Sequence, residues 1–318
     1  MSTPNTNIPS GQDTLPYHVP VMADQCLAGL DIKKDGTYID VTFGGGGHSR
    51  AILEKLGNGK LIAFDQDPDA YENAREFLDD PRFLFIQANF RYLKRYLKIH
   101  RIDPVDGILA DLGVSSHQID DPRRGFSTRF DAALDMRMDA SHGEATAWDV
   151  VNTYSAEQLQ HVLGHYGEVH NARTLATAIY ASRHNAPVNT ARELTDILKR
   201  FAPRFKEFKY YAQVFQAIRI EVNKELEALE DFLRQTPDVL KPHGRLVVMS
   251  YHSLEDRLVK NFIQKGDFSG EPEKDFYGNV IKPFNALTRK PVEAGEAEIA
   301  GNPRARSAKL RIAERIAE

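Results

Sequence analysis

The chain has 318 residues, of which 42% are apolar and 27% are charged, and its formal net charge at pH 7 is −4. This composition is typical of a globular protein with room for one large domain or two modest ones. No stretch approaches the ~18 consecutive apolar residues of a membrane span, and the negative net charge argues against nucleic-acid binding over the whole surface.

Two local features bear on the cellular compartment. Cys26 is the only cysteine, which excludes a disulfide framework and a cysteine-based zinc site and favours a reducing environment. Residues 1–18 are polar and proline-rich, without the basic and apolar regions of a signal peptide, and we expect them to form a disordered tail. The predicted location is therefore cytoplasmic.

Strands and helices alternate in the first third of the chain. Apolar runs bounded by turn residues predict strands at residues 37–43, 60–67, 82–90 and 105–113. Patterns of helical period predict helices at residues 21–32, 49–57, 69–78 and 92–102. Such alternation implies parallel pairing, right-handed crossovers and an α/β sheet that is covered on both faces.

The alternation stops between residues 120 and 211, where helical patterns follow one another at 155–167, 170–184 and 190–201. We predict a helical insertion for substrate recognition over 120–211, within a sheet domain made of residues 19–119 and 212–318. The α/β pattern resumes with a helix at 221–235, in which Val222, Leu226, Leu229 and Leu233 form one apolar stripe. The remaining predicted elements are a strand at 245–253, a helix at 254–264, a loop-rich stretch at 265–303 and a strand at 308–314.

Four consecutive glycines, Gly44 to Gly47, separate the first strand from the next helix. At such a turn the bare backbone can approach a ligand, and the helix N-terminus favours polar or anionic groups. A phosphate-binding P-loop needs a lysine after the last glycine, and His48 stands there instead. A nicotinamide or flavin site needs a third small residue, for which Ser49 is the best match, so this interpretation is weakened but stays open.

A third interpretation is S-adenosylmethionine, which carries a ribose and an amino acid but no phosphate. It requires an acidic residue at the end of the second strand to accept hydrogen bonds from the ribose hydroxyls, and Asp65 stands there. Asp111 ends the fourth strand and could bind the methionine amino group or face the methyl acceptor. Both aspartates could simply cap helices, but a glycine loop and two acids at three strand ends favour a ligand site at this edge of the sheet.

Several longer motifs resemble the bacterial MraW/RsmH family: TFGGGGHS, ADLGVSSHQID, RGFS, LDMRMD, FQAIRIEVNKEL, SYHSLEDRLVK and NPRARSAKLRIAER. The resemblance extends from about Tyr17 to Ala317. Members of this family are S-adenosylmethionine-dependent methyltransferases that act on a cytosine N4 of small-subunit (16S) ribosomal RNA. The resemblance implies an α/β fold, a Rossmann-like class I methyltransferase sheet with an inserted helical domain, and S-adenosylmethionine as the cofactor.

The cofactor contacts of the family carry over by motif position onto Gly46, Gly47, His48, Asp65, Phe90, Asp111 and Gln118. Phe90 follows the third strand, where its ring could pack against adenine or belong to the core. Gly45 stands where the family most often has a basic residue among the loop glycines. We expect this difference to be tolerated, because the backbone holds the ligand.

Methyl transfer from a sulfonium is an in-line displacement that requires neither a metal nor a covalent intermediate, so the protein mainly positions the reactants. An acceptor beside the exocyclic N–H of cytosine would localise the nitrogen lone pair and take the proton. Asp111 is the first catalytic candidate, followed by Ser250 and His252 of the SYHS turn. Carbon-5 methylation would need a thiolate, and Cys26 precedes the glycine loop and is in the wrong place for it.

The candidate substrate-binding residues are Arg124, Phe126, Asp135, Arg137, Asp139 and Tyr251. Phe126 or Tyr251 would stack on the target base, because the stacking aromatic residue of related amino-methylating enzymes is missing after the fourth strand. The charged residues of LDMRMD could bind phosphate or base, or could anchor the insertion through internal ion pairs. Arg123 and Arg129 lie in the same segment as Arg124 and would extend an RNA-facing surface.

The expected partner is 16S ribosomal RNA within the small ribosomal subunit, because a base buried in a duplex would first have to be unstacked. Basic stretches at 94–101, 199–209 and 302–315 would make binding salt-sensitive, although each alone is more typical of a solvated helix face. Monomer and homodimer both stay open. Methylation of another RNA acceptor, oxidoreduction with a nicotinamide and non-catalytic ribosome assembly stay open as well. Trp148 is expected in the core.

Overall fold

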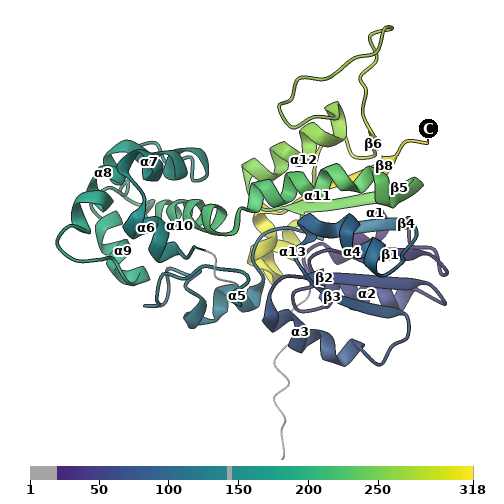
Figure 1. The fold of residues 1–318 in the computed structure, drawn as a ribbon, viewed down its shortest axis with the longest axis horizontal. Helices are drawn as coiled ribbons and strands as arrows, with labels where there is room; N and C mark the ends of the chain where they lie inside the picture. Colours follow the sequence, from purple (N-terminus) through teal and green to yellow (C-terminus); the bar gives the residue numbers. More distant parts are fainter. Residues whose placement is uncertain (1–19, 142–144, 318) are drawn as a thin grey trace, which may run out of the picture.

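The computed structural model describes residues 20–141 and 145–317. The predicted tail at residues 1–18 lies outside this part of the chain. The described residues form one sheet with helices on both faces and a separate group of helices beside it (Figure 1). None of the described helices is both long and apolar enough to cross a membrane.

The strands of the described chain are β1 (Thr37–Asp40), β2 (Lys60–Asp65), β3 (Phe83–Gln87), β4 (Val105–Asp111), β5 (Leu240–Ser250), β6 (Phe284–Ala286), β7 (Val292–Glu293) and β8 (Lys309–Arg315). They form a sheet of order β3-β2-β1-β4-β5-β8-β6, with β7 paired to β8. Strands β1 to β5 are parallel, whereas β8 is antiparallel to its neighbours. The parallel strands confirm the predicted α/β sheet. Strands β2 and β3 lie on one side of β1, whereas β4 and β5 lie on the other side. Open sheets of this kind bind ligands where the strand order changes side, here between β1 and β4.

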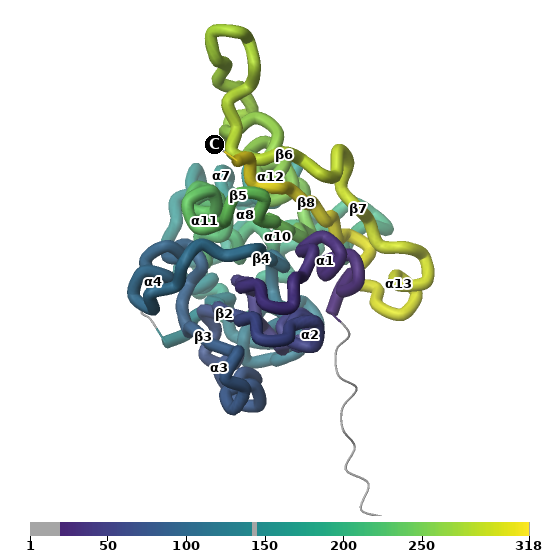
Figure 2. Tube along the Cα trace, turned by 90° about the vertical axis from the view of Figure 1, so that its right-hand side faces the viewer, coloured from purple at the N-terminus to yellow at the C-terminus, as the bar shows by residue number. Residues whose placement is uncertain are grey.

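Helices cover both faces of the sheet, because alternate strand residues point to opposite faces. The covering helices are α1 (Ala23–Leu30), α2 (Gly47–Lys55), α3 (Pro68–Ala74), α4 (Leu93–Ile99), α11 (Glu225–Val239) and α12 (Ser253–Lys265). Leu246 and Val248 join an apolar cluster with α4, α11 and α12, whereas Val247 and Met249 join a second cluster with α1, α2 and α3. Figure 2 shows α4 and α11 on one side of the strands and α1 on the other.

The segment between β4 and α11 contains α5 (Ser116–Asp120), α6 (Ala147–Thr153), α7 (Ala156–His165), α8 (Ala172–Ser182), α9 (Ala191–Leu198) and α10 (Glu207–Asn223). Helices α6 to α10 enclose an apolar core of their own, in which Leu159, Leu175 and Leu194 are buried. Trp148 on α6, expected in the core, is 37% exposed. Its indole N–H donates to Asn189 Oδ1 at 3.0 Å, so this large ring lies at the surface with its polar end bonded.

The connection from α10 to α11 differs from the predicted one. Helix α10 continues across the boundary that we place after residue 211 and ends at Asn223. Lys224 follows with φ 50° and ψ 42°, a left-handed conformation that breaks the helix. The predicted stripe is therefore divided, with Val222 on α10 and the three leucines on α11. A single left-handed residue leaves the helical period on either side intact, and the sequence pattern does not reveal it.

The C-terminal stretch 265–303 is not simply a loop. It contains β6, β7 and α13 (Glu296–Gly301), and the short 3-10 turn η4 (Pro303–Ser307) follows. Phe284 of β6 is fully buried, and β6 and β7 both pair with β8. Strands of two or three residues are too short to show alternation, so their place in the sheet depends on β8 alone.

Candidate functional site

A pocket of about 730 Å³ opens at the carboxyl ends of β1, β2 and β4. Its wall includes the glycine loop, the turn after β2, the segment 111–119 and the turn after β5. Five further wall residues are not among the predicted site residues, although they lie in two of the motifs that carry the family resemblance: Gln216, Arg219, Asn302, Arg304 and Ser307. The pocket therefore lies where the strand order reverses and where α10 meets the sheet.

The glycine loop presents bare backbone to this pocket. Gly44, with φ 52°, and Gly46, with φ 77°, adopt left-handed conformations that favour glycine. A Cβ atom at Gly46 would lie 2.8 Å from the Phe77 ring, so this glycine faces the aromatic core and not the pocket. A Cβ atom at Gly45 would have no described atom within 4 Å, so this position has space for a larger side chain.

Asp65 ends β2 at the wall of the pocket. Its Oδ2 accepts the Gly44 N–H at 2.8 Å, and its Oδ1 accepts the Asp67 N–H at 2.9 Å. Burial raises the pKa of this carboxyl to about 6, although the two N–H groups act against the increase. Each oxygen keeps a lone pair for a further donor, so Asp65 can still accept hydrogen bonds from a diol.

Asp111 ends β4 and faces two aromatic rings. Tyr251 donates its hydroxyl to Asp111 Oδ1 at 2.8 Å, and His48 Nδ1 lies 3.7 Å from Asp111 Oδ2. Burial raises the pKa of Asp111 to about 6, and both His48 and the Tyr251 hydroxyl limit the increase. Burial and the negative charge of Asp111 raise the pKa of Tyr251 in turn, so Tyr251 remains a hydrogen-bond donor.

His48 has a defined orientation in the first turn of α2. Its Nε2 lies 3.0 Å from the Val21 carbonyl oxygen, which can only accept, so Nε2 carries a proton and Nδ1 faces Asp111. In the same turn, Ser49 donates its hydroxyl to Asp40 Oδ2 at 2.7 Å. Asp40 is fully buried at the end of β1 and is not among the predicted site residues. These contacts fix the start of α2, and with it the glycine loop, on the sheet.

Gln118 and Phe90, two further predicted cofactor residues, both line the pocket. Gln118 forms a capping box with Ser115 at the start of α5, and its Nε2 donates to Asp67 Oδ2 at 2.6 Å. Both polar ends of this amide are thus bonded within the protein. Phe90 begins the 3-10 turn η2 (Phe90–Tyr92) and packs edge to face on Phe232, with ring centroids 5.4 Å apart. Its ring therefore belongs to the core and to the pocket wall at once.

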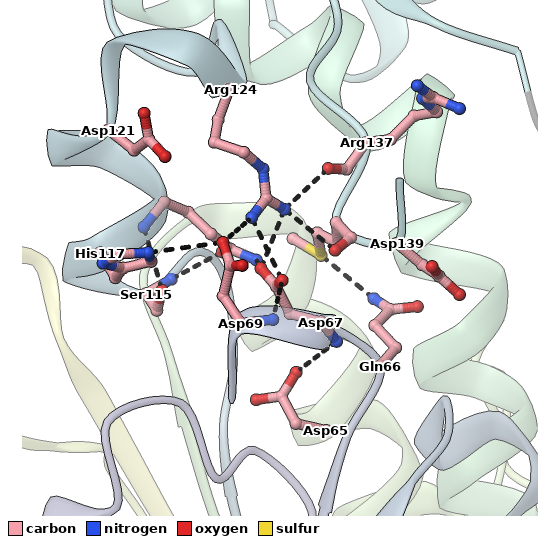
Figure 3. A network of polar contacts seen from close by, with 12 residues as sticks. Asp65, Gln66, Asp67, Asp69, Ser115, His117, Asp121, Arg124, Arg137 and Asp139 are labelled. Atoms are coloured by element: carbon pink, nitrogen blue, oxygen red, sulfur yellow. Dashed lines mark hydrogen bonds and ion pairs between the residues drawn. The ribbon is translucent and has the colours of Figure 1, made fainter. Parts of the chain in front are cut away.

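Arg124, in the 3-10 turn η3 (Pro122–Arg124), clamps the segment after α5 onto the turn after β2 (Figure 3). Its terminal nitrogens bind Asp67 at 3.1 and 2.9 Å and Asp69 at 2.8 Å. They also donate to the carbonyl oxygens of Arg137 and Met138, both at 3.0 Å. We predict from the sequence that Arg124 binds substrate, but its side chain is only 12% exposed and is engaged inside the protein. Its geometry is that of a clamp.

The other charged and aromatic residues of this segment lie around the clamp. Arg137 binds Asp135 through two N–H groups at 2.9 and 2.8 Å, and Asp139 accepts the Ser141 N–H at 2.9 Å. Phe126 packs at the edge of the helical core. None of these four predicted substrate residues belongs to the pocket wall that residues 20–141 and 145–317 form. The ion pair between Arg137 and Asp135 lies within LDMRMD, and the backbone of the motif is bound by the side chains of Arg124 and of Asn223 on α10.

Some residues of the SYHS turn line the pocket, and others are buried in the core. Tyr251 and His252 line the pocket. Ser250, a predicted catalytic residue, is buried and directs its hydroxyl to the Lys309 carbonyl oxygen at 3.4 Å. The reason is that β5 extends through Ser250 and pairs it with Lys309 of β8, which keeps the hydroxyl out of the pocket.

A buried charge cluster beneath this turn joins α10, α11 and α12. Glu255 Oε2 accepts the Tyr251 N–H at 2.9 Å, and Glu255 Oε1 lies 3.2 Å from His252 Nε2. Burial acts to raise the pKa of Glu255, but His252, the Tyr251 N–H and Arg219 keep it below its usual value. Arg219 binds Glu225 at 2.8 and 2.9 Å. Glu255 therefore fixes the backbone that carries the Tyr251 ring.

The sequence is similar to known proteins over almost its whole length. The profile of the MraW methylase family covers residues 16–316. A relative from Cytophaga hutchinsonii, named ribosomal RNA small subunit methyltransferase H, is 58% identical over 94% of this chain and 99% of that protein. Relatives with the same name from Flavobacterium johnsoniae and Bacteroides thetaiotaomicron are 56% and 53% identical, over 95% and 96% of this chain and 99% of each relative. The similarity thus includes both the sheet and the helical unit.

Proposed function

The chain belongs to the MraW methylase family, and from this premise we propose that it transfers a methyl group from S-adenosylmethionine to the 16S ribosomal RNA of the small subunit. The acceptor that we propose is the exocyclic N4 of a cytidine. The observation that carries the proposal is that one pocket contains both the Asp65 carboxylate, which is hydrogen-bonded to the glycine loop, and the Asp111–Tyr251 pair.

The residues of the pocket fit S-adenosylmethionine. Gly44, Gly45 and Gly47 offer backbone without side chains, and the described wall contains no lysine beside them, in keeping with a ligand that has no phosphate. Asp65 would accept hydrogen bonds from the ribose hydroxyls, and Phe90 would pack against adenine. When bound, this cofactor supplies a methyl group on a sulfonium that a nitrogen lone pair can displace in line, without a metal or a covalent intermediate.

Asp111 is the proposed proton acceptor. An exocyclic cytosine amine delocalises its lone pair into the ring, and a carboxylate that accepts its N–H returns electron density to the nitrogen. The Tyr251 hydroxyl on Asp111 Oδ1 holds the carboxylate in one orientation. A pKa of about 6 keeps Asp111 charged at neutral pH, and it makes this carboxylate a stronger base than an exposed aspartate.

Tyr251 and His252 are the proposed contacts to the target base, because they line the pocket beside Asp111. The Tyr251 ring is a candidate for stacking, since an aromatic face can hold an extruded base. We propose that the substrate is RNA within the small subunit, whose fold presents the base without the cost of opening a duplex. The protein would then act in the cytoplasm.

Small ribosomal subunits from a strain that lacks this activity provide the test. They are incubated with the protein and methyl-labelled S-adenosylmethionine, the RNA is digested to nucleosides, and the labelled nucleoside is identified by mass spectrometry. The expected product is N4-methylcytidine. Label in a different nucleoside would overturn the acceptor and leave the methyl donor in place.

A variant of Asp111, the proposed proton acceptor, distinguishes a catalytic protein from a non-catalytic assembly factor. Asp111→Asn keeps the shape of the side chain and removes its basic oxygen, and it should slow methyl transfer at least ~100-fold while the protein still binds subunits. Wild-type protein that binds the cofactor and the subunit but transfers no label would point to a non-catalytic assembly factor.

A further inference from the structure

Two phenylalanines project from the connection between α9 and α10. Phe205 is 97% exposed, and Phe208 in the first turn of α10 is 85% exposed. Single apolar residues are common on protein surfaces, but two aromatic rings within four residues leave a large apolar area in water. Neither ring belongs to the helical core, whereas the neighbouring Tyr211 is buried in it. The ring centroids of Phe208 and Tyr211 are 6.4 Å apart.

The same connection is strongly basic. Lys199 pairs with Asp196, and Glu207 is the one carboxylate within residues 199–209. Four exposed cations form no ion pair with any other described residue: Arg200, Arg204, Lys206 and Lys209. Together with Phe205 and Phe208, these four residues make up what we call the basic aromatic surface. Its charge is positive although the chain as a whole carries −4.

Helix α10 connects this surface to the pocket. Phe208 and Arg219 are eleven residues apart on α10, which is about three helical turns and ~17 Å along the axis. Ala212 and Gln216 lie between them at helical spacing on the same face, and Ala212 is exposed. Gln216 and Arg219 belong to the pocket wall. One face of α10 therefore leads from the exposed rings to the site of chemistry.

We propose that the basic aromatic surface binds an unpaired segment of the substrate RNA, with bases stacked on Phe205 and Phe208. The cations neutralise the neighbouring phosphates, and the strand continues along α10 to the pocket. The inference rests on the proposed function, because it takes RNA as the substrate. Unpaired RNA is the partner that fits both features, since aromatic faces stack only on bases released from a helix, whereas a duplex needs charge alone.

The chain offers a matched control at the opposite charge. Phe276 and Tyr277 are 98% and 86% exposed at a turn closed by the bridge between Lys274 and Val280. Figure 1 shows this segment as a loop that projects beyond α12 before β6. Three carboxylates precede or flank the two rings: Glu271, Glu273 and Asp275. Lys274 is the one cation within residues 271–277, so two exposed aromatic rings are presented here with a net negative charge.

The test compares three variants of the full chain: F205A/F208A, F276A/Y277A and R204Q/K206Q/K209Q. Affinity for a labelled unstructured RNA oligonucleotide is measured by fluorescence anisotropy over a range of salt concentrations, and cofactor binding is measured by calorimetry. F205A/F208A should weaken RNA binding about ten-fold or more at every salt concentration. Each cation that neutralises a phosphate of single-stranded RNA contributes about 0.7 to the slope of log affinity against log salt concentration. The triple charge variant should therefore reduce the magnitude of this slope by roughly 2. F276A/Y277A should bind RNA as the wild type does, and all three should bind S-adenosylmethionine normally.

Turnover on small subunits then separates this inference from the proposed function. F205A/F208A should raise KM for subunits and leave kcat unchanged. If the wild type methylates subunits and F205A/F208A does so with the same KM, the basic aromatic surface has no part in substrate binding. Equal losses in F205A/F208A and F276A/Y277A would overturn the proposal too, as would Phe-dependent binding to anionic lipid vesicles without binding to RNA. A wild type that methylates no RNA would overturn the proposed function itself.

Discussion

Two partly buried carboxylates at strand ends differ in the donors that reach them. Asp65 accepts two backbone N–H groups, from Gly44 and Asp67, whereas Asp111 accepts the hydroxyl of Tyr251, which follows the neighbouring strand β5. Burial raises the pKa of both carboxyls to about 6. The two backbone donors bind both oxygens of Asp65 and suit a carboxylate that holds the ligand. The Tyr251 hydroxyl orients Asp111 through Oδ1 alone, so Oδ2 can accept a proton.

Replacing Tyr251 by Phe should shift the pH dependence of methyl transfer. The hydroxyl stabilises the charged form of Asp111, so its loss raises the pKa of that carboxyl and moves the acid limb of the rate profile to higher pH by roughly one unit. Single-turnover rates on small subunits between about pH 5 and 8 measure the shift. Tyr154→Phe, which removes a hydroxyl from Glu221 at 2.7 Å in the helical unit, is the control. An unchanged acid limb in the Tyr251 variant would exclude Asp111 as the proton acceptor.

Asp65→Asn should weaken cofactor binding at all pH values and change how stability depends on pH. The raised folded-state pKa of Asp65 stabilises the ligand-free protein below the ordinary value of 3.8, and this contribution is lost as pH rises through about 6. The free energy of unfolding of the wild type should therefore fall relative to the variant by ~1–2 kcal/mol between these values, after a discount for partial exposure. Thermal unfolding at several pH values measures this difference, and parallel pH curves would contradict the assignment.

At the scale of elements, the stability of the site depends on how the turn after β2 is held. Arg124 joins Asp67 and Asp69 to the carbonyl oxygens of residues 137 and 138, so one guanidinium connects the start of α3 to the insertion. Gln118 holds the same Asp67 from α5. The turn that carries Asp65 is thus tied to the helical unit by side chains far apart in the sequence.

Arg124→Ala should destabilise the protein by about 3 kcal/mol, because it leaves the buried Asp67 carboxylate without its ion pair. The neighbouring Arg123→Ala is the control: the Arg123 side chain is 84% exposed, although the Asp121 side chain that it binds is 7% exposed, so the change should cost less, at most about 1 kcal/mol. Chemical denaturation measures both. Equal stability of the two variants would mean that the clamp contributes nothing.

At the scale of the molecule, two cores are built on one chain. The sheet packs its faces against the flanking helices, and α6 to α10 pack around their own apolar centre. The pocket rests mainly on the sheet, with Gln216 and Arg219 as the contribution of α10. A destabilising substitution in one core should therefore affect S-adenosylmethionine binding and turnover of small subunits unequally.

Leu175→Ala and Leu233→Ala test this division with the same chemical change. Both leucines are fully buried, Leu175 in the helical core and Leu233 against the sheet, and each truncation should cost ~2–5 kcal/mol. Hydrogen exchange should increase over α6 to α10 in the first variant, with S-adenosylmethionine binding intact and subunit turnover reduced. The second variant should lose cofactor affinity as well. Loss of cofactor binding in both would show that the two cores act as one.

The order and approximate positions of the first four strands could be predicted from the sequence, although each strand ends two or three residues before its predicted limit. Short apolar runs followed by glycines or acids are local signals, so Gly44 to Gly47, Asp65 and Asp111 follow from neighbours along the chain, and parallel pairing then brings them to one edge. The helical insertion also followed from its period. The helix break at Lys224 and the two-residue strand β7 could not be predicted, because neither changes the periodicity of the apolar residues around it.

Only the tertiary structure decided which segments far apart in the sequence contact one another. Tyr251 meets Asp111 across 140 residues, Arg124 turns inward to Asp67 across 57, and β8 enters the sheet between β5 and β6 and draws Ser250 out of the pocket. Each outcome depends on which polar groups are buried together and must bond to one another. Local sequence determines which elements form and which residues stand at their ends, but burial is a property of the packed chain, and it alone decided which of those residues face the pocket.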